Sequence, residues 1–291
     1  MTGAICLIGF GEVGQTLAEG FAASDVRVVA WDVLFVDEHS GPRKAALARE
    51  VRVARAAAPA THGAELVISA VTAAQTRAAA ESCAPGLAAG AYYLDLNSAS
   101  PHAKKEAAAI INAAGGRYIE AAVMSPIAPK RMATNMLLGG PHAGAFLPFA
   151  RNYGFTGATV YSQAYGQAAA AKLCRSVIVK GMEALLTESF LAARFYGVED
   201  AVLSSLNDLF PGPDWERHAR YMISRAIEHG ARRAEEMREA ARTVSDAELN
   251  PLMSEACAAR QDWAAGFRAA LGKSDLRSML DQVRADLREG Q

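Results

Sequence analysis

Three glycines near the start of the chain have the spacing of a phosphate-binding turn. Gly9, Gly11 and Gly14 form the pattern G-x-G-x-x-G, between a short apolar run over residues 4–8 and a helical stretch over residues 15–23. There Gly9 permits a tight turn, Gly11 lets the backbone approach a pyrophosphate, and Gly14 lets helix and strand pack closely. The free amides and the dipole of the new helix supply an anion site, although a plain glycine-rich turn is the alternative. We expect a dinucleotide to contact the whole turn: Gly9, Phe10, Gly11, Glu12, Val13 and Gly14.

An acidic residue follows at the position where a ribose can be bound. A second apolar run over residues 26–31 ends on Asp32, about twenty positions beyond the glycines. A carboxylate there accepts hydrogen bonds from the ribose hydroxyls of NAD and repels the 2′-phosphate of NADP. The nearest bases, Arg43 and Lys44, lie beyond a long loop and could fold back onto a phosphate. We therefore expect NAD as the cofactor, with NADP as the open alternative.

A polar stripe on a mostly apolar helix is the second candidate for chemistry. Lys172, Ser176 and Lys180 are spaced four apart, so they share one helix face, and Arg175 lies beside them. A desolvated lysine near another cation favours its neutral form, which a general base requires. The alternative is that Lys172 lies on the exposed face of an amphipathic helix, because buried lysines are rare.

The elements that must hold these residues change in kind near Gly166. The first part alternates strand and helix signals, which favours a parallel sheet with helices on both faces. The expected strands are 4–8, 26–31, 51–53, 66–71, 92–94, 118–122, 135–138 and 159–161, and the expected helices are 15–23, 74–83, 101–114 and 142–151. Residues 34–43 are interpreted as a long loop that either wraps the adenosine end of the cofactor or is an insertion on the surface, and we favour the surface insertion. From residue 167 onward only helices are expected: 168–196, 201–210, 215–241, 246–271 and 275–288.

These signals predict two domains. The fold class is α/β, with a Rossmann-type doubly wound parallel sheet followed by an all-α C-terminal region. The expected cofactor domain comprises residues 1–165, and the expected helical domain for substrate binding and dimerisation comprises residues 166–291.

Composition and charge argue against several classes of partner. Thirty Lys and Arg against 31 Asp and Glu leave a net charge of −1, which gives no reason to expect nucleic acid or an anionic membrane. The four cysteines are scattered, which is typical of buried thiols in a reducing compartment, and the six histidines are equally dispersed. No run approaches the ~20 apolar residues of a membrane-spanning helix. We expect a cytoplasmic protein with a small-molecule substrate and without a metal, nucleic acid or membrane.

The order of these motifs resembles the β-hydroxyacid dehydrogenases, the group of 3-hydroxyisobutyrate and 6-phosphogluconate dehydrogenases. In that family the helical domain opens with G-x-G-x-x-x-K, and Gly166 and Lys172 match the first glycine and the lysine. Residues 67–72, 95–101 and 118–126 resemble the strand that ends over the cofactor, the D-x-S-T-x-x-P segment and the D-A-P-V-S-G-G substrate loop. The resemblance implies that Lys172 is the catalytic acid/base, with Ser176 one turn further along the helix. It also implies that the cofactor contacts Val71, Thr72, Asn97 and Ser98.

The chain departs from the family pattern at the substrate site. Ala168 replaces the second glycine, and Met124-Ser125-Pro126 replaces S-G-G. The family carries asparagine at one or both of the third and fourth positions after the lysine, and this chain has Arg175 and Ser176 there. Pro126 has no amide proton to donate. A basic pair, Lys130 and Arg131, follows in the same loop. It either binds a substrate anion or is an ordinary solvated pair. The substrate-binding candidates are Met124, Ser125, Lys130, Arg131 and Arg175. The departures resemble a divergent branch with an uncharacterised C-terminal domain, and they argue against a standard 3-hydroxyisobutyrate or 6-phosphogluconate activity.

The residues favour an NAD(P)-dependent oxidoreductase that acts on a small hydroxy acid or related alcohol. Lys172 would take the hydroxyl proton during oxidation and return it during reduction, and the second catalytic candidate, Ser176, would hydrogen-bond the substrate or orient the lysine. The cofactor carries the hydride. Two alternatives stay open. One is imine reduction on the same architecture, and the other is an NAD-binding interaction protein without turnover.

We predict at least a homodimer, built through the helical domain. The expected helix is apolar beyond a single stripe over residues 169–191, and a helix that is apolar nearly all round must be buried. Two-fold dimers are the commonest way for a chain to bury such a surface. Light scattering at low protein concentration measures the assembly. A persistent mass of 30.7 kDa, that of one chain, would show instead that the later helices wrap this one within a monomer.

Overall fold

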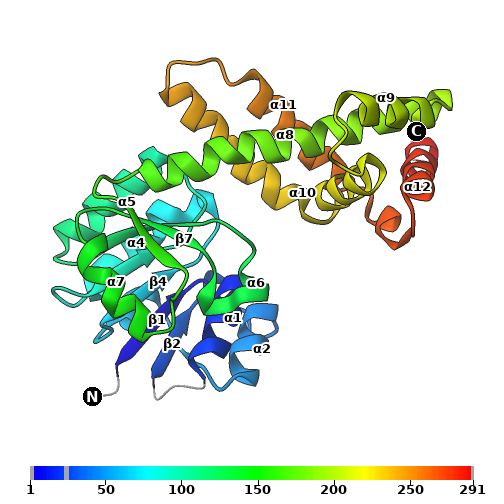
Figure 1. Ribbon diagram of the computed structural model, residues 1–291. Coiled ribbons are helices and arrows are strands. Elements are labelled where there is room, and N and C mark those ends of the chain that lie inside the picture. Colours follow the sequence, from blue (N-terminus) through cyan, green and yellow to red (C-terminus); the bar gives the residue numbers. More distant parts are fainter. Residues whose placement is uncertain (1–2, 23–25, 290–291) are drawn as a thin grey trace. The chain divides into compact units, whose positions relative to one another are not determined.

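The structure, a computed structural model, describes residues 3–22 and 26–289 (Figure 1). It divides into two compact units, Met1–Lys172 and Leu173–Gln291. The expected helix over residues 15–23 begins at Glu12 and ends at Phe21, and Ala23 lies outside the described residues.

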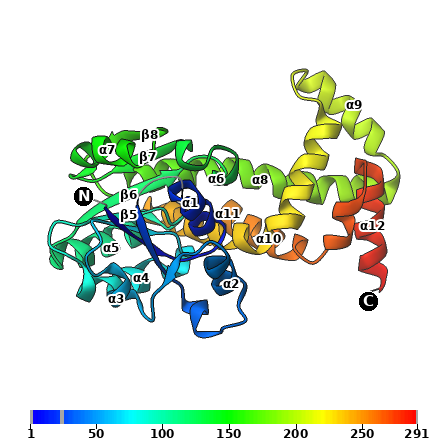
Figure 2. The same cartoon turned by 90° about the horizontal axis from the view of Figure 1, so that it is seen from below.

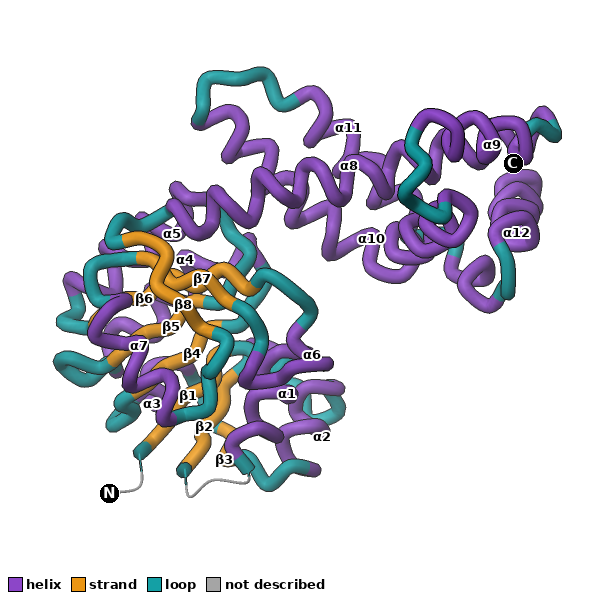
Figure 3. Tube along the Cα trace, in the orientation of Figure 1, coloured by secondary structure: helices purple, strands orange, loops and turns teal. Residues whose placement is uncertain are grey.

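An eight-stranded sheet forms the centre of the first unit, as Figure 3 shows in orange. The strands are β1 (Ala4–Ile8), β2 (Arg27–Trp31), β3 (Arg52–Val53), β4 (Leu66–Ser69), β5 (Tyr92–Asp95), β6 (Arg117–Val123), β7 (Met136–Gly139) and β8 (Ala158–Ser162). Their order is β3-β2-β1-β4-β5-β6-β7-β8, and all neighbours pair in parallel except β6 and β7. The direction of winding reverses between β1 and β4. In such sheets, ligands bind outside the carboxyl ends of the strands at this reversal.

Helices cover both faces of the sheet. They are α1 (Glu12–Phe21), α2 (Gly41–Ala48), α3 (Ala57–Thr61), α4 (Thr76–Cys83), α5 (Pro101–Ala113), α6 (Ile127–Lys130) and α7 (Ala143–Asn152). Successive side chains of β1 point to opposite faces: Ile5 and Leu7 pack with α1, α2 and α7, whereas Cys6 and Ile8 pack with α3, α4 and α5. A parallel sheet buries both faces, which is why its strands are continuous apolar runs in the sequence.

The described part of the second unit contains helices and turns but no strands. Its helices are α8 (Gln167–Tyr196), which begins in the first unit, α9 (Glu199–Leu209), α10 (Trp215–Asp246), α11 (Leu252–Ala264) and α12 (Leu276–Glu289). Helices α10 and α11 approach closely at Gly230, where an added Cβ would lie 2.2 Å from the carbonyl oxygen of Gln261. No helix in the described ranges is long and apolar enough to cross a membrane.

The predicted fold class is confirmed, and each predicted strand agrees with an observed strand to within two residues at both ends. The prediction of a loop over residues 34–43 is wrong in its secondary structure, although most of the segment is exposed as expected. A 3-10 turn at Val33–Val36 and the start of α2 occupy it. Ser40 caps α2, and Pro42 lies in the first turn, where a missing amide proton costs nothing.

The predicted helix over residues 246–271 is also wrong at its start. Helix α10 continues to Asp246, and α11 begins only at Leu252. Pro251 disfavours a helical backbone at Asn250, so the sequence itself contains the break. Within the same predicted span, Arg268–Gly272 forms a separate 3-10 turn after α11.

We predict that one of the four thiols reacts in the native protein. Cys174 is exposed, contrary to the expectation of four buried thiols, whereas Cys6, Cys83 and Cys257 are buried. Burial raises the pKa of the Cys83 thiol to about 12 and that of Cys257 to about 11, and it also raises the pKa of Cys6. These three thiols therefore stay protonated and unreactive at neutral pH. Titration with a chromogenic disulfide should show one fast equivalent that Cys174→Ser removes. A fast phase that survives this substitution would contradict the burial of the other three.

Candidate functional site

The glycine-rich turn lies where β1 ends and α1 begins. Gly9 has a φ of +90°, and a Cβ there would lie 2.4 Å from the carbonyl oxygen of Ala70. A Cβ on Gly14 would lie 2.3 Å from the carbonyl oxygen of Gly9, whereas a Cβ on Gly11 would meet open space. No side chain in the described ranges caps the first turn of α1. The backbone amides of that turn therefore have no side-chain acceptor, and such free amides at a helix start can bind an anionic group.

Asp32 lies directly after β2, beside this turn. Its Oδ2 accepts a hydrogen bond of 2.7 Å from the amide of Phe10, and its Oδ1 accepts one of 2.9 Å from the amide of Leu34. These two bonds fix the carboxylate, and each oxygen keeps acceptor capacity for a further donor. The turn and the carboxylate together fit the pyrophosphate and the ribose of a dinucleotide.

Arg43, the base that could have favoured NADP, is held by its own segment of chain. Its Nη1 donates to the carbonyl oxygen of Phe35 at 2.6 Å, and its Nη2 lies 3.6 Å from the carboxylate of Glu38. The guanidinium therefore already has local partners. This geometry favours Asp32 as the group that meets the ribose.

One side-chain amide joins the ends of β4 and β5. Asn97 Oδ1 accepts a hydrogen bond of 2.7 Å from the amide of Val71, and its Nδ2 donates to Ser69 Oγ at 3.0 Å. Thr72 follows Val71 and is exposed at the same edge of the sheet. The predicted cofactor contacts after β1, β2, β4 and β5 therefore lie at the carboxyl ends of neighbouring parallel strands.

A buried charge network fixes the loop that carries Asn97. Asp95 is fully buried, and its Oδ1 accepts from Lys104 Nζ and from the amide of Asn97, each at 2.8 Å. Its Oδ2 accepts from the Tyr118 hydroxyl at 2.6 Å. Burial and the Asp95 carboxylate raise the pKa of Tyr118 well above its usual value, so the hydroxyl keeps its proton and donates it. The carboxylate therefore holds β5, α5 and β6 together at one point.

Helix α8 brings Lys172 to this loop. The half-buried Lys172 donates from Nζ to Ser98 Oγ at 2.6 Å. The start of the helix is bound by Glu120 on β6, whose carboxylate accepts hydrogen bonds from the amides of Gly166 and Ala169. The lysine therefore lies at the same edge of the sheet as the predicted cofactor contacts.

The residues of the predicted substrate loop are not all brought to this edge. Ser125 Oγ is buried, and no described atom is its hydrogen-bond partner. The amide of Met124 is already bound to the carbonyl oxygen of Asn135 at 2.9 Å. The Ser125 hydroxyl is thus a buried polar group without a hydrogen-bond partner among the described residues.

The basic pair of this loop lies elsewhere. Lys130 and Arg131 are exposed at the end of α6, which lies beside α1 (Figures 1 and 2). Arg131 Nη2 is 3.7 Å from the carboxylate of Glu19. Glu19 is seven residues beyond Glu12, so it lies about 10 Å along α1 from the glycine-rich turn. The pairing turns Arg131 toward the far end of α1.

Arg175 and Ser176 belong to the second unit. Arg175 is exposed, whereas Ser176 is buried and accepts a hydrogen bond of 3.5 Å from Lys180 Nζ. Lys180 also forms an ion pair with Glu236 on α10. The polar stripe of α8 thus continues into an ion-pair network between helices.

Three almost fully buried charged residues are not among the predicted site residues: Glu120, Asp95 and Lys104. Asp95 and Glu120 lie in segments that carry the family resemblance, but no role is predicted for them. A signal was present, because each carboxylate lies in a run of apolar strand residues. A charged group in such a run needs a partner to offset its desolvation.

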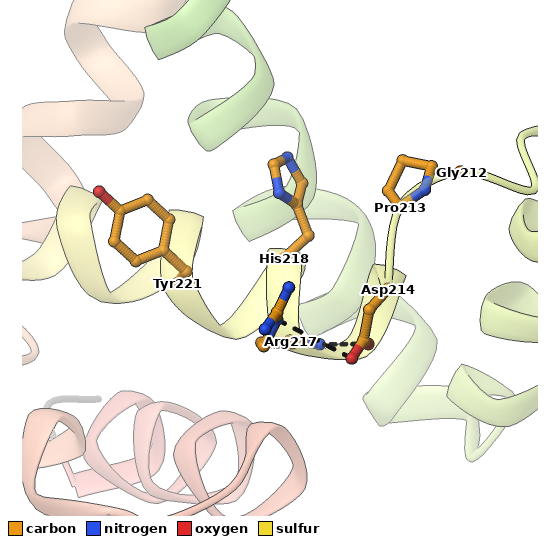
Figure 4. A pocket seen from close by; sticks show the side chains of 6 residues that line it. All are labelled: Gly212, Pro213, Asp214, Arg217, His218 and Tyr221. Atoms are coloured by element: carbon orange, nitrogen blue, oxygen red, sulfur yellow. Dashed lines mark hydrogen bonds and ion pairs between the residues drawn. The ribbon is translucent and has the colours of Figure 1, made fainter.

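A separate pocket of about 370 Å³ lies at the start of α10 in the second unit (Figure 4). Its lining residues are Gly212, Pro213, Asp214, Arg217, His218 and Tyr221. Asp214 caps the helix by accepting a hydrogen bond of 3.1 Å from the amide of Arg217. None of the predicted site residues lines this pocket.

Two family models match the chain. Residues 4–146 match the NAD binding domain of 6-phosphogluconate dehydrogenase, and residues 193–264 match a domain of unknown function (DUF1932). No curated protein matches the chain. The first match and the fit of the glycine-rich turn agree, and the first unit binds NAD(P).

Solved structures match the chain over nearly its full length. A conserved hypothetical protein from Sinorhizobium meliloti 1021 is 34% identical with a TM-score of 0.77, and the match covers 98% of this chain and 97% of that chain. A conserved protein of unknown function, described as structurally similar to 3-hydroxyacid dehydrogenases, is 28% identical with a TM-score of 0.70, covering 93% and 100%. A 3-hydroxyisobutyrate dehydrogenase from Mycobacterium tuberculosis, solved with L-serine, has the same fold at 19% identity, with a TM-score of 0.71 and coverage of 98% and 100%.

We predict that Asp32→Asn weakens NADH binding. The substitution removes the charge that we expect to accept the ribose hydroxyls. A hydrogen bond to a charged group is worth about 1.5–3 kcal/mol, which corresponds to about 10–100-fold in Kd. NADPH binding should weaken less, because the repulsion of its 2′-phosphate is also removed. Nicotinamide fluorescence titrations measure both constants.

Asp37→Asn is the matched control, because Asp37 also accepts an amide hydrogen bond, from His39 at 2.8 Å, in the same segment. It should leave both constants unchanged. Tighter binding of NADPH than of NADH by the unmodified chain would show that Arg43 or Lys44 reaches the ribose phosphate.

Proposed function

Because this chain belongs to the β-hydroxyacid dehydrogenase superfamily, we propose that it transfers hydride between a nicotinamide and the carbinol carbon of a small hydroxy acid or related alcohol. The match to an NAD binding domain makes it an NAD(P)-dependent oxidoreductase, and the substrate class and the acid/base are our proposal. The observation that carries the proposal is the hydrogen bond of 2.6 Å between Lys172 Nζ and Ser98 Oγ. It supports a lysine amine at the carboxyl edge of the sheet, where the cofactor residues also lie.

The proposed role of Lys172 is to move one proton per turnover. During oxidation its neutral amine accepts the proton of the substrate hydroxyl, and during reduction its ammonium returns a proton to the new alkoxide oxygen. The nicotinamide, when bound, supplies or accepts the hydride. Ser98 can stay bonded to the lysine in both states, because a hydroxyl accepts from an ammonium and donates to an amine.

The other residues of this edge bind and orient. The amides of the glycine-rich turn would hold the pyrophosphate and Asp32 the adenosine ribose, while Asn97 keeps the backbone at Val71 in place. Ser125 is the proposed hydrogen-bond partner of a polar substrate group, since its buried hydroxyl lacks a described partner. We also propose residues 1–165 as the cofactor domain and residues 166–291 as the domain for substrate binding and dimerisation.

We predict that Lys172→Met lowers kcat by about 10²–10⁴-fold, the usual contribution of a general acid/base. The Kd for NADH should not change, because the proposed cofactor contacts stay intact. Steady-state rates measure kcat, and fluorescence titrations measure the Kd for NADH. Lys105→Met, which removes an exposed lysine on α5, is the matched control and should keep the wild-type rate. Wild-type turnover by the Lys172 variant would contradict the proposed role.

A substrate panel tests the reaction class. Small hydroxy acids and the corresponding alcohols with NAD(P), and cyclic imines with NAD(P)H, are followed by nicotinamide absorbance. The proposal requires oxidation of at least one member of the first group. Activity on imines alone would make the chain an imine reductase. Cofactor binding without turnover of any member would favour an interaction protein.

A further inference from the structure

We propose that Glu120 is the positioning residue for Lys172, an inference that rests on the proposed function of that lysine. Its carboxylate, in the middle of β6, binds the first turn of α8 and so holds the lysine amine on Ser98. Glu120 itself touches neither the cofactor nor the substrate in this proposal.

The surroundings of Glu120 show that its carboxylate binds the start of α8. It is fully buried, and it lies opposite Asp95 on β5 and Gly139 on β7 in the sheet register. Asp95 has the ammonium of Lys104 as its partner, at 2.8 Å. Glu120 instead accepts from two main-chain amides, that of Gly166 and, at 2.6 Å, that of Ala169. The charge of the carboxylate is therefore met by the positive end of the α8 dipole.

The chain before α8 is shaped for this contact. Gly166 has a φ of +92°, a conformation that other residues rarely adopt, and an added Cβ would lie 3.0 Å from Pro101 Cβ. A Cβ on Gly139 would lie 2.9 Å from Glu120 Oε2, so the glycine leaves room for the carboxylate. Tyr165, just before the helix, also donates to the carbonyl oxygen of Tyr118 on β6, at 3.3 Å.

These contacts determine where Lys172 lies. Ala169 is three residues before Lys172, so the carboxylate fixes the turn from which the lysine side chain extends. The other end of the lysine contact is fixed independently, because Asp95 and Asn97 hold the loop of Ser98 on β5. The amine and the hydroxyl are thus held from neighbouring strands, and a shift of about 1 Å in α8 would break a contact of this length.

The first test needs no cofactor and no turnover. Brief acetylation of the folded protein, followed by peptide mass spectrometry, gives the reactivity of Lys172 relative to the exposed Lys105 in the same molecule. Glu120→Gln offers one acceptor oxygen for two amides, so the lysine should leave Ser98 and its relative reactivity should rise about fivefold. Ser98→Ala should give a similar rise. Glu106→Gln, which removes the charge of a half-buried carboxylate on α5 that pairs with Arg77, is the matched control and should give none.

A second variant keeps the charge and changes only the space. Gly139→Ala puts a methyl group against Glu120 Oε2 and displaces the carboxylate from α8, so it should also raise the reactivity of Lys172. This variant decides the question if Glu120→Gln does not fold. Unchanged reactivity of Lys172 in the folded variants would overturn the proposal.

The kinetic test separates positioning from general support of the fold. Glu120→Gln should lower kcat by about 10–100-fold, as misplacement of a catalytic group does, with KM and the Kd for NADH unchanged. In the Lys172→Met background the same substitution should cost less than about twofold, because the lysine through which it acts is gone. An equal loss in both backgrounds would overturn the proposal. Wild-type turnover by Lys172→Met alone would instead refute the proposed function, and the acetylation result would still judge Glu120.

Discussion

The contact between the Glu120 carboxylate and the first turn of α8 joins a helix to the middle of a sheet strand. A buried carboxylate must be compensated, and here the compensation comes from backbone amides that any helix has at its start. The first turn of α8 is therefore bound to β6 within the first unit. Lys172, Ser98 and the network behind Ser98 keep their relation only as long as this contact holds.

Two carboxylates in register on adjacent strands would repel each other if both were left unpaired. In the structure the two carboxylates have different partners. Asp95 accepts hydrogen bonds from Lys104 and Tyr118, and Glu120 accepts them from main-chain amides at the start of α8. Each pairing connects the sheet to a different element, so a single pair of strands orients both α5 and α8. Removing one partner of a buried ion pair typically lowers the free energy of unfolding by about 3–5 kcal/mol, because the other charge stays buried without compensation. Substitutions at these positions are therefore expected to be destabilising.

Much of the first unit could be predicted from local pattern. Parallel strands buried on both faces are short continuous apolar runs, and the glycine-rich turn has a fixed spacing, so β1 to β8 were placed correctly. Local rules also contained the missed helix boundaries, such as the start of α2 at its cap Ser40 and the break before α11 at Pro251. The partners of the charged residues could not be predicted, because the ion pair of Arg131 with Glu19 and the hydrogen bond from the Ala169 amide to Glu120 form only in the folded chain. Spacing in the sequence does not encode such long-range pairs.

The double use of Asp32 limits how this chain can acquire a new cofactor preference. Its carboxylate is an acceptor for the amide of Phe10 inside the glycine-rich turn as well as a candidate partner of the ribose. A substitution that admits a 2′-phosphate by removing the acid also reduces the acceptors for the amides of Phe10 and Leu34: asparagine keeps one side-chain oxygen for the two amides, and an apolar residue keeps none. A change of specificity at this position therefore also disturbs the hydrogen bonding of the glycine-rich turn. Laboratory evolution starting from single replacements at this position would pass through variants whose turn is loosened for both nucleotides.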